Sequence, residues 1–180
     1  KGLSISVDRA RTGETFTTLD GTELVLDGTE LTIRDRERAV ALAGVVGGKN
    51  SGIKESSSSD STSSSTTDVF IESAYFTPGA VRRTMRKFGL NTDSGYRFAR
   101  GVNPETTADV LDRATALMLE VAGGEACAHR VDIYPSPVQR SEITVSLSTV
   151  ESRLGYKVEA SDFELWIHRL GGELRAVNPG

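Results

Sequence analysis

Glycines gather in a loop that follows an apolar stretch, and a loop of this kind can bring backbone close to a ligand. Residues 44–52 contain Gly47, Gly48 and Gly52. Phosphate-binding loops also follow buried strands, but this segment lacks their Gly-Lys-Ser/Thr ending and runs into serines instead of a helix. Paired glycines more simply allow a ligand to approach the main chain. We therefore expect Gly47 and Gly48 to border a binding site.

A carboxylate forms the second candidate group. Glu72 follows the apolar residues 69–71, and alternation along a predicted strand gives it the same face as Phe70. A carboxylate on an inward face needs hydrogen-bond partners or a function. Two interpretations stay open, a structural glutamate held by backbone donors and a ligand-binding glutamate. Thr92 and Ser94, which follow the next predicted helix, are further polar candidates.

Basic residues form the third candidate group, and only Asp93 opposes them locally. They are Arg82, Arg83, Arg86, Lys87, Arg97 and Arg100. Like charges four residues apart on a helix repel each other by about 0.2–0.5 kcal/mol unless an anion is near. The cluster is therefore either a solvated helix face or a contact surface for phosphates.

Composition restricts the function classes. The chain has 180 residues and a formal net charge of −4, so a long nucleic-acid interface is not expected. Its single cysteine, Cys127, cannot form an internal disulfide, and with two histidines there is no zinc-ligand set. The chain has neither an apolar run near twenty residues nor a signal-peptide block, which favours a cytoplasmic protein without a membrane span.

Strands and turns dominate the first fifty residues. Residues 3–7 alternate with period two, and Asp20-Gly21 and Asp27-Gly28 have the composition of hairpin turns. Residues 39–46 are apolar at every position, which is typical of a strand covered on both faces. The pattern predicts an antiparallel meander that leads into a buried strand.

Helices are predicted mainly in the second half. After a serine-rich stretch at 56–67, expected to be a mobile surface loop, residues 69–76 read as a strand. A helix should begin at Pro78 and end at Gly89, and a longer one, expected to pack on the sheet, should begin at Asn103-Pro104 and end at Gly123. The fold class expected is α+β, a mostly antiparallel sheet with packed helices.

Two closely spaced prolines, Pro135 and Pro137, indicate a linker. We expect one domain at 1–134, a linker at 135–140 and the start of a second, small α/β domain at 141–180. In that second part a strand is predicted at 143–145, a short helix capped by Ser148, and another helix opening at Ser161-Asp162.

Three ordered motifs resemble one known family. They are Val-Ala-Leu-Ala-Gly-Val-Val-Gly-Gly at 40–48 with Ser51-Gly52, Phe-Ile-Glu-Ser-Ala-Tyr-Phe-Thr-Pro at 70–78, and Gly-Leu-Asn-Thr-Asp-Ser-Gly-Tyr-Arg-Phe-Ala-Arg-Gly-Val-Asn-Pro at 89–104. Together they closely resemble the central editing domain of bacterial phenylalanyl-tRNA synthetase beta chains. By the same resemblance, residues 141–180 look like the start of the winged-helix-like domain that follows, and a histidine-bearing pocket segment is expected upstream of residue 1.

The resemblance implies a function and a set of site residues. Such domains hydrolyse tyrosine wrongly attached to tRNA(Phe), in an alpha2beta2 assembly whose alpha subunit is the aminoacylating partner. ATP and magnesium belong to the full enzyme, with no cofactor expected in this segment. The matching pocket positions are Gly47, Glu72, Thr92 and Ser94, with Ser94 where the family often has alanine and Ala99 where it usually has glutamate.

The expected chemistry follows from these positions. Glu72 would accept the hydrogen bond of the tyrosine hydroxyl, and backbone N–H groups near Gly47 and Gly48 could stabilise an oxyanion. The basic cluster would contact tRNA. Since no nucleophile–base pair is evident, water is the expected attacking group.

Two alternatives of other classes compete with hydrolysis. One is a scaffold that docks tRNA or the alpha subunit, and the other is an accessory domain of the lysidine-synthetase type, which has a related fold. The second should lack a glutamate-ended strand paired with Thr-Asp-Ser, and this sequence has both.

Overall fold

The computed structural model of the chain describes residues 4–53, 66–139 and 141–175. The chain divides into two units, Lys1–Ile133 and Tyr134–Gly180. Most of the predicted serine-rich loop lies outside the described residues. No described helix is both long and apolar enough to cross a membrane.

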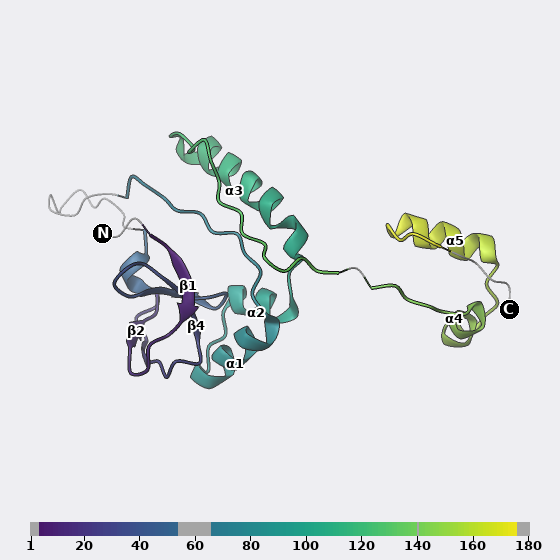
Figure 1. The fold of residues 1–180 in the computed structure, drawn as a ribbon, viewed down its shortest axis with the longest axis horizontal. Coiled ribbons are helices and arrows are strands. Elements are labelled where there is room, and N and C mark those ends of the chain that lie inside the picture. Colours follow the sequence, from purple (N-terminus) through teal and green to yellow (C-terminus); the bar gives the residue numbers. More distant parts are fainter. Residues whose placement is uncertain (1–3, 54–65, 140, 176–180) are drawn as a thin grey trace. The chain divides into compact units, whose positions relative to one another are not determined.

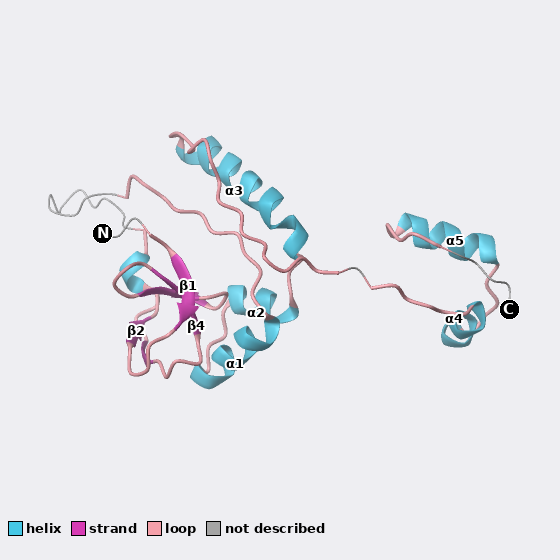
Figure 2. Cartoon of the chain, in the orientation of Figure 1, coloured by secondary structure: helices cyan, strands magenta, loops and turns pink. Residues whose placement is uncertain are grey.

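An antiparallel sheet with helices beside it forms the first unit (Figure 1, Figure 2). The four-stranded sheet has the order β1-β4-β5-β6, and β2 and β3 pair as a separate two-stranded sheet. The strands are β1 Ser6–Arg9, β2 Thr15–Thr17, β3 Glu23–Val25, β4 Leu31–Arg34, β5 Ala39–Leu42 and β6 Val46–Gly47. The predicted α+β class, with an antiparallel sheet and packed helices, is confirmed.

The two predicted hairpin turns have different outcomes. Asp20-Gly21 lies in the hairpin between β2 and β3, where Gly21 has φ 93° and the Thr18 hydroxyl accepts from Thr22 N at 3.0 Å. Asp27-Gly28 is a turn as well, but β3 and β4 belong to different sheets, so it joins no hairpin. That second prediction was wrong because local turn chemistry does not determine which strands pair.

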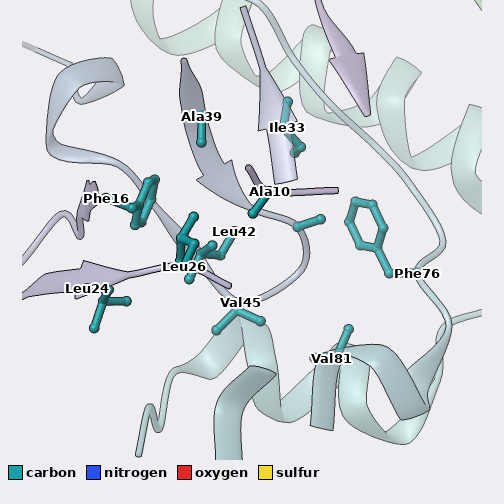
Figure 3. Packing of buried hydrophobic residues seen from close by; sticks show 11 residues of the cluster. Ala10, Phe16, Leu24, Leu26, Ile33, Ala39, Leu42, Val45, Phe76 and Val81 are labelled. Carbon is teal, nitrogen blue, oxygen red and sulfur yellow. The ribbon is translucent and has the colours of Figure 1, made fainter. Parts of the chain in front are cut away.

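The core lies between the two sheets and the helix α1, Pro78–Phe88 (Figure 3). Its buried side chains include Phe16 and Leu26 from the region of the small sheet, Leu42 from β5, and Val81 from α1. Leu26 and Leu42 are each only 1% exposed. Segments far apart in sequence therefore share one apolar cluster, as a single domain core requires.

The apolar run 39–46 is not one strand, as predicted, but two strands joined by a tight turn. Gly44 stands at the turn with φ 69°, in the left-handed region that favours glycine. A Cβ at Gly44 would lie 2.8 Å from Phe76 Cδ2. Residues before and after this turn are both largely buried. An apolar run interrupted by a turn therefore has the same composition as one buried strand.

Gly44→Ala is expected to destabilise the fold, since it adds both backbone strain and a clash with Phe76. We expect the free energy of unfolding to fall by about 1–3 kcal/mol, measured by urea denaturation. Gly47→Ala is the matched control, because a Cβ at Gly47 meets no atom within 4 Å and φ there is not positive. Equal stability of the two variants would contradict this account.

Helix α1 has the predicted start and end, and Gly89 closes it with φ 64°. The next helix, α2 Asp93–Arg100, was not predicted. Its N-cap Thr92 accepts a hydrogen bond from Gly95 N at 3.0 Å, a signal that the sequence does contain. The helix was missed because glycine, here Gly95, is unfavourable inside a helix. In the structure a Cβ at Gly95 would lie 2.7 Å from Met85 Sδ. Gly95 therefore leaves room for the end of the Met85 side chain to pack against α2.

The third helix is preceded by the single turn η2, Pro104–Thr106, and spans Thr107–Ala122 as α3. It has no buried residue, and Val110 and Val121 of its apolar stripe are 55% and 85% exposed. The prediction that it packs as the main helix on the sheet was therefore wrong. Helix α1 supplies buried side chains instead, those of Val81 and Thr84. Amphipathicity alone does not select the surface that a helix covers.

Residues 69–76 form no strand, contrary to prediction. Phe70 is 71% exposed, whereas Phe76 is buried in the core. The segment is β-prone in composition, but no described strand pairs with it, and strand propensity depends on such pairing.

The second unit contains two described helices, α4 Leu147–Leu154 and α5 Ala160–Arg169. The N-cap of α4 is Ser146, two residues before the predicted Ser148, and its hydroxyl accepts from Thr149 N at 3.2 Å. The described residues include no strand at 143–145, so that prediction was wrong. Gly155 ends α4 with φ 80°, as predicted.

Candidate functional site

A cleft of about 470 Å³ opens in the first unit beside the β5–β6 turn. Its walls come from Gly44–Gly47 of the turn region, from residues 72–74, from α2, and from residues 102–110. Apolar side chains such as Ile33 and Phe98 form much of the lining, with a few polar groups among them. This volume and lining are typical of sites for small organic ligands.

Among the described residues, Glu72 is the only acidic one that lines the cleft. Glu72 is exposed, yet the protein atoms around its carboxyl remove part of the hydration of that group and raise its pKa above the ordinary value. Among the described residues no side chain or backbone N–H donates to this carboxylate. A partly desolvated carboxylate with no donor is suited to accept a hydrogen bond from a ligand.

The backbone beside Glu72 is held by its neighbour. Ser73 Oγ donates to Thr107 O at 2.7 Å, which connects the extended segment to the start of α3. Thr107, Thr106 and Asn103 also line the cleft. None of these four polar residues was predicted for the site. Three of them lie near the predicted Asn-Pro helix start, which was the only sequence pattern that could have indicated them. No local pattern indicates Ser73.

The two candidate glycines are placed differently. Gly47 lines the cleft, and no atom would lie within 4 Å of a Cβ there. Gly48 is buried outside the cleft lining, and its N–H donates to Val40 O at 2.8 Å. A Cβ at Gly48 would lie 2.7 Å from that same oxygen. Gly47 therefore leaves space for a ligand, whereas Gly48 allows close packing of the sheet.

Thr92 and Ser94 both connect α2 to the β5–β6 turn. The Thr92 hydroxyl donates to Val45 O at 2.6 Å and also accepts the capping bond of α2, so its hydrogen-bonding capacity is used within the fold. Ser94 Oγ donates to Gly44 O at 3.2 Å, and Ser94 lines the cleft. The structure thus brings Gly47, Glu72 and Ser94 to one cleft, with Thr92 positioning the helix behind it.

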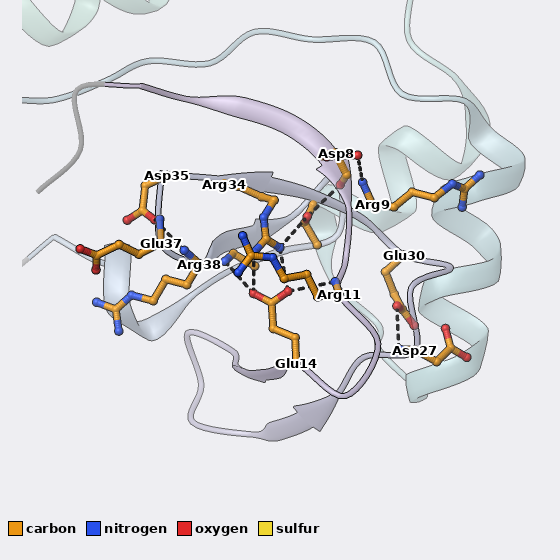
Figure 4. A network of polar contacts seen from close by, with 12 residues as sticks. Asp8, Arg9, Arg11, Glu14, Asp27, Glu30, Arg34, Asp35, Glu37 and Arg38 are labelled. Atoms are coloured by element: carbon orange, nitrogen blue, oxygen red, sulfur yellow. Dashed lines mark hydrogen bonds and ion pairs between the residues drawn. The ribbon is translucent and has the colours of Figure 1, made fainter.

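The six predicted basic residues are all exposed, but three have partners within the fold. Lys87 Nζ contacts Asp27 Oδ2 at 2.7 Å and also pairs with the buried Glu30 (the two acids appear in Figure 4). The hydrogen bond from Lys87 lowers the pKa of Asp27. The ammonium group therefore connects α1 to the turn before β4 and is largely neutralised there.

Two arginines contact α2 itself. Arg82 Nη1 donates to Ala99 O near the end of that helix, and Arg100 Cζ lies 3.6 Å from the centroid of the Tyr96 ring. Arg83, Arg86 and Arg97 make no hydrogen bond or ion pair with the described residues. These three guanidinium groups are available to an external anion.

Sequence patterns did not indicate the most buried ion pair, Glu14 with Arg34 (Figure 4). Arg34 Nη1 and Nη2 donate to the two Glu14 oxygens at 2.7 and 2.9 Å, and the N–H groups of Arg11 and Ala39 donate to the same carboxylate. The Arg34 hydrogen bonds are the main reason that the pKa of Glu14 is lowered to about 2. Within the described ranges, no cluster of three His, Cys, Asp or Glu side chains could hold a metal ion.

Comparison with known proteins gives a family and a set of relatives. Residues 1–123 match the B3/4 domain family. The chain is 54% identical over 173 residues to the phenylalanine–tRNA ligase beta subunit of Bdellovibrio bacteriovorus, covering 96% of this chain and 20% of that protein. It is 42% identical over 177 residues to the subunit of the same name from Geobacter sulfurreducens, covering 98% of this chain and 21% of the relative.

The chain therefore spans about a fifth of the length of the curated relatives that it matches. The similarity extends over nearly all of its residues, and the matched domain includes the cleft with Gly47, Glu72 and Ser94. On this evidence the chain belongs to the B3/4 domain family.

Proposed function

We propose that this chain is the editing part of a phenylalanine–tRNA ligase beta subunit, where it hydrolyses tyrosine wrongly esterified to tRNA(Phe). The names of its relatives support the ligase context. The observation that carries the editing role is Glu72, a partly desolvated carboxylate that has no donor among the described residues and lines a largely apolar cleft.

Recognition of tyrosine would depend on its one extra hydroxyl. A tyrosyl side chain in the cleft donates its phenol hydrogen to Glu72, which compensates for the hydration that the carboxylate has lost. A phenylalanyl side chain fills the same apolar space but leaves the carboxylate unpaired. Sites built around a hydroxyl discriminate strongly for this reason, and correctly charged tRNA(Phe) is spared.

Hydrolysis would proceed by attack of water on the aminoacyl ester. Gly47 lets the ester carbonyl approach the main chain at the cleft wall, where a backbone N–H can stabilise the developing oxyanion. The N–H of Gly48 is already bonded to Val40 O, so the oxyanion contact is assigned to the main chain at Gly47. The ribose hydroxyl next to the ester helps to position the water, and no covalent intermediate is involved.

The remaining functions belong to the assembled ligase. We propose that the alpha subunit completes an alpha2beta2 enzyme, and that ATP and magnesium act at its aminoacylation site. The direct test is deacylation of Tyr-tRNA(Phe) and Phe-tRNA(Phe) by the intact protein that contains this chain. Faster loss of tyrosine supports editing, and equal rates contradict it.

The preference for tyrosine should depend on pH through Glu72. Burial raises the pKa of its carboxyl, and the ionised form is the better acceptor for the phenol. Selectivity for Tyr-tRNA should therefore be complete well above this raised pKa and should fall as pH decreases through it. Rates of Tyr- and Phe-tRNA deacylation measured across the acidic range would report the change.

Glu72→Gln provides the control for the pH experiment, since the amide does not titrate. Its selectivity should be lower than that of the unmodified protein at neutral pH and should not change with pH. If the selectivity of the unmodified protein does not change at acidic pH, Glu72 does not control it. If Glu72→Gln keeps the pH dependence, another group is responsible for it.

A further inference from the structure

Helix α2 connects the cleft to a basic surface. Ser94 and Phe98 line the cleft from one face of the helix. Successive helical side chains point about 100° apart, so Arg97, Arg100 and Tyr96 follow one another around the axis, away from the cleft face. From Ser94 to Arg100 the helix advances by only about 9 Å. A flexible polymer whose end lies in the cleft would therefore meet Arg97 first and then the Tyr96–Arg100 pair.

Tyr96 and Arg100 form an ordered flat surface. The guanidinium carbon lies 3.6 Å from the centre of the ring, within the range of a cation–π contact. Tyr96 is 55% exposed, so part of its ring stays accessible from solvent. Aromatic rings and arginine planes are the groups on which proteins stack unpaired bases.

The charges around this pair are suited to a polyanion. Residues 78–100 contain six basic side chains and one acidic one, Asp93, in a chain with a net charge of −4. Asp93 belongs to the first turn of α2 and forms no ion pair with a described arginine. Arg83, Arg86 and Arg97 are likewise without partners among the described residues. The surface therefore has cations available for phosphates beside a ring available for a base.

We propose that the Tyr96–Arg100 pair is a stacking platform for an unpaired base near the 3′ end of the RNA whose terminal ester occupies the cleft. Arg97, between the cleft and the platform, contacts a phosphate of the same strand. The proposal rests on the ester-hydrolysing function proposed above, and it names the part of the substrate that the cleft itself does not bind. The stacked base belongs to a nucleotide upstream of the terminal one, because Tyr96 points away from the cleft face of α2.

The test separates RNA contact from chemistry in the cleft. Tyr96→Ser should raise KM for Tyr-tRNA(Phe) deacylation about tenfold, the effect of losing one stacked base, with kcat unchanged. Tyr96→Phe should retain the native KM, since the ring and not the hydroxyl is required. Hydrolysis of tyrosine ethyl ester, which has no RNA, should be the same in all three proteins.

Tyr156→Ser is the matched control, because Tyr156 is 56% exposed but lies in the second unit. It should leave KM unchanged, and circular dichroism should show that both serine variants are folded. A KM that does not change in Tyr96→Ser, or that changes equally in the two serine variants, would overturn the proposal.

Direct binding keeps the platform testable even if the protein hydrolyses no ester. An unpaired RNA tetranucleotide, followed by fluorescence anisotropy, should bind about tenfold more weakly to Tyr96→Ser than to the unmodified protein, whereas a blunt RNA duplex should not distinguish them. Arg97→Met should reduce the slope of log K against log salt by about 0.7, the value for one phosphate of a single strand. Equal loss with duplex RNA, or with an acidic peptide in place of RNA, would indicate a nonspecific anion surface and would contradict base stacking.

Discussion

Replacing Glu72 by alanine should reduce deacylation of Tyr-tRNA(Phe) by about 10- to 100-fold, the effect of losing a hydrogen bond to a charged group. Deacylation of Phe-tRNA(Phe) should stay at its low rate, because phenylalanine makes no bond to the carboxylate. The ratio of the two rates, the selectivity, should therefore fall toward one. Initial rates measured with each charged tRNA at neutral pH would show this.

Two further variants separate recognition from packing. Glu72→Gln keeps the size of the side chain and a neutral acceptor, so it should lose less activity than Glu72→Ala. Glu23→Ala removes an exposed carboxylate from β3, outside the cleft lining, and should have no effect. Unchanged rate and selectivity in Glu72→Ala would exclude this residue as the acceptor of the phenol. Such a result would also favour a scaffolding role for the chain.

The second large effect concerns stability and the Glu14–Arg34 pair. The side chains of Arg34 and Glu14 are only 6% and 13% exposed. Arg34→Met would leave the Glu14 carboxylate largely buried without its charged partner, which typically costs about 3–5 kcal/mol. Urea denaturation at neutral pH should show this decrease. Glu37→Gln, which changes an exposed neighbour on the same surface, should shift stability by less than about 0.5 kcal/mol.

The Glu14–Arg34 pair should also make the free energy of unfolding depend on pH in the acidic range. The pKa of Glu14 is about 2 in the folded chain and 4.5 as its ordinary value. A lowered folded pKa means that the contribution is fully present above pH 4.5 and is lost as pH falls through about 2. In Glu14→Gln that part of the acid dependence should disappear. Identical slopes of stability against pH in the two proteins would contradict the assignment.

Hydrophobic replacement gives an independent test of the pair. Glu14→Leu combined with Arg34→Met removes both charges, and buried pairs replaced in this way often recover stability. The double variant should therefore be more stable than Arg34→Met alone. If the losses of the two single variants simply add in the double variant, the side chains are not coupled in the way the distances indicate.

Local signals in the sequence determined part of this fold. The start and end of α1 follow from Pro78 and Gly89, and the β2–β3 hairpin follows from Asp20-Gly21, because caps and turns act within a few residues. The motifs that resemble editing domains also indicated the family, and they contain the three residues that meet in the cleft, Gly47, Glu72 and Ser94. Such positions can be read without knowing the tertiary structure.

Tertiary structure alone decided which groups became partners. Glu14 pairs with Arg34 across 20 positions, Thr92 reaches Val45 across 47, and Lys87 reaches Glu30 across 57. Composition could not show that Lys87 pairs with two acids while Arg97 stays available. Nor could it show that residues 69–76 pair with none of the described strands. Burial, charge pairing and sheet formation depend on which distant segments meet, and that is settled by the packing of the whole domain.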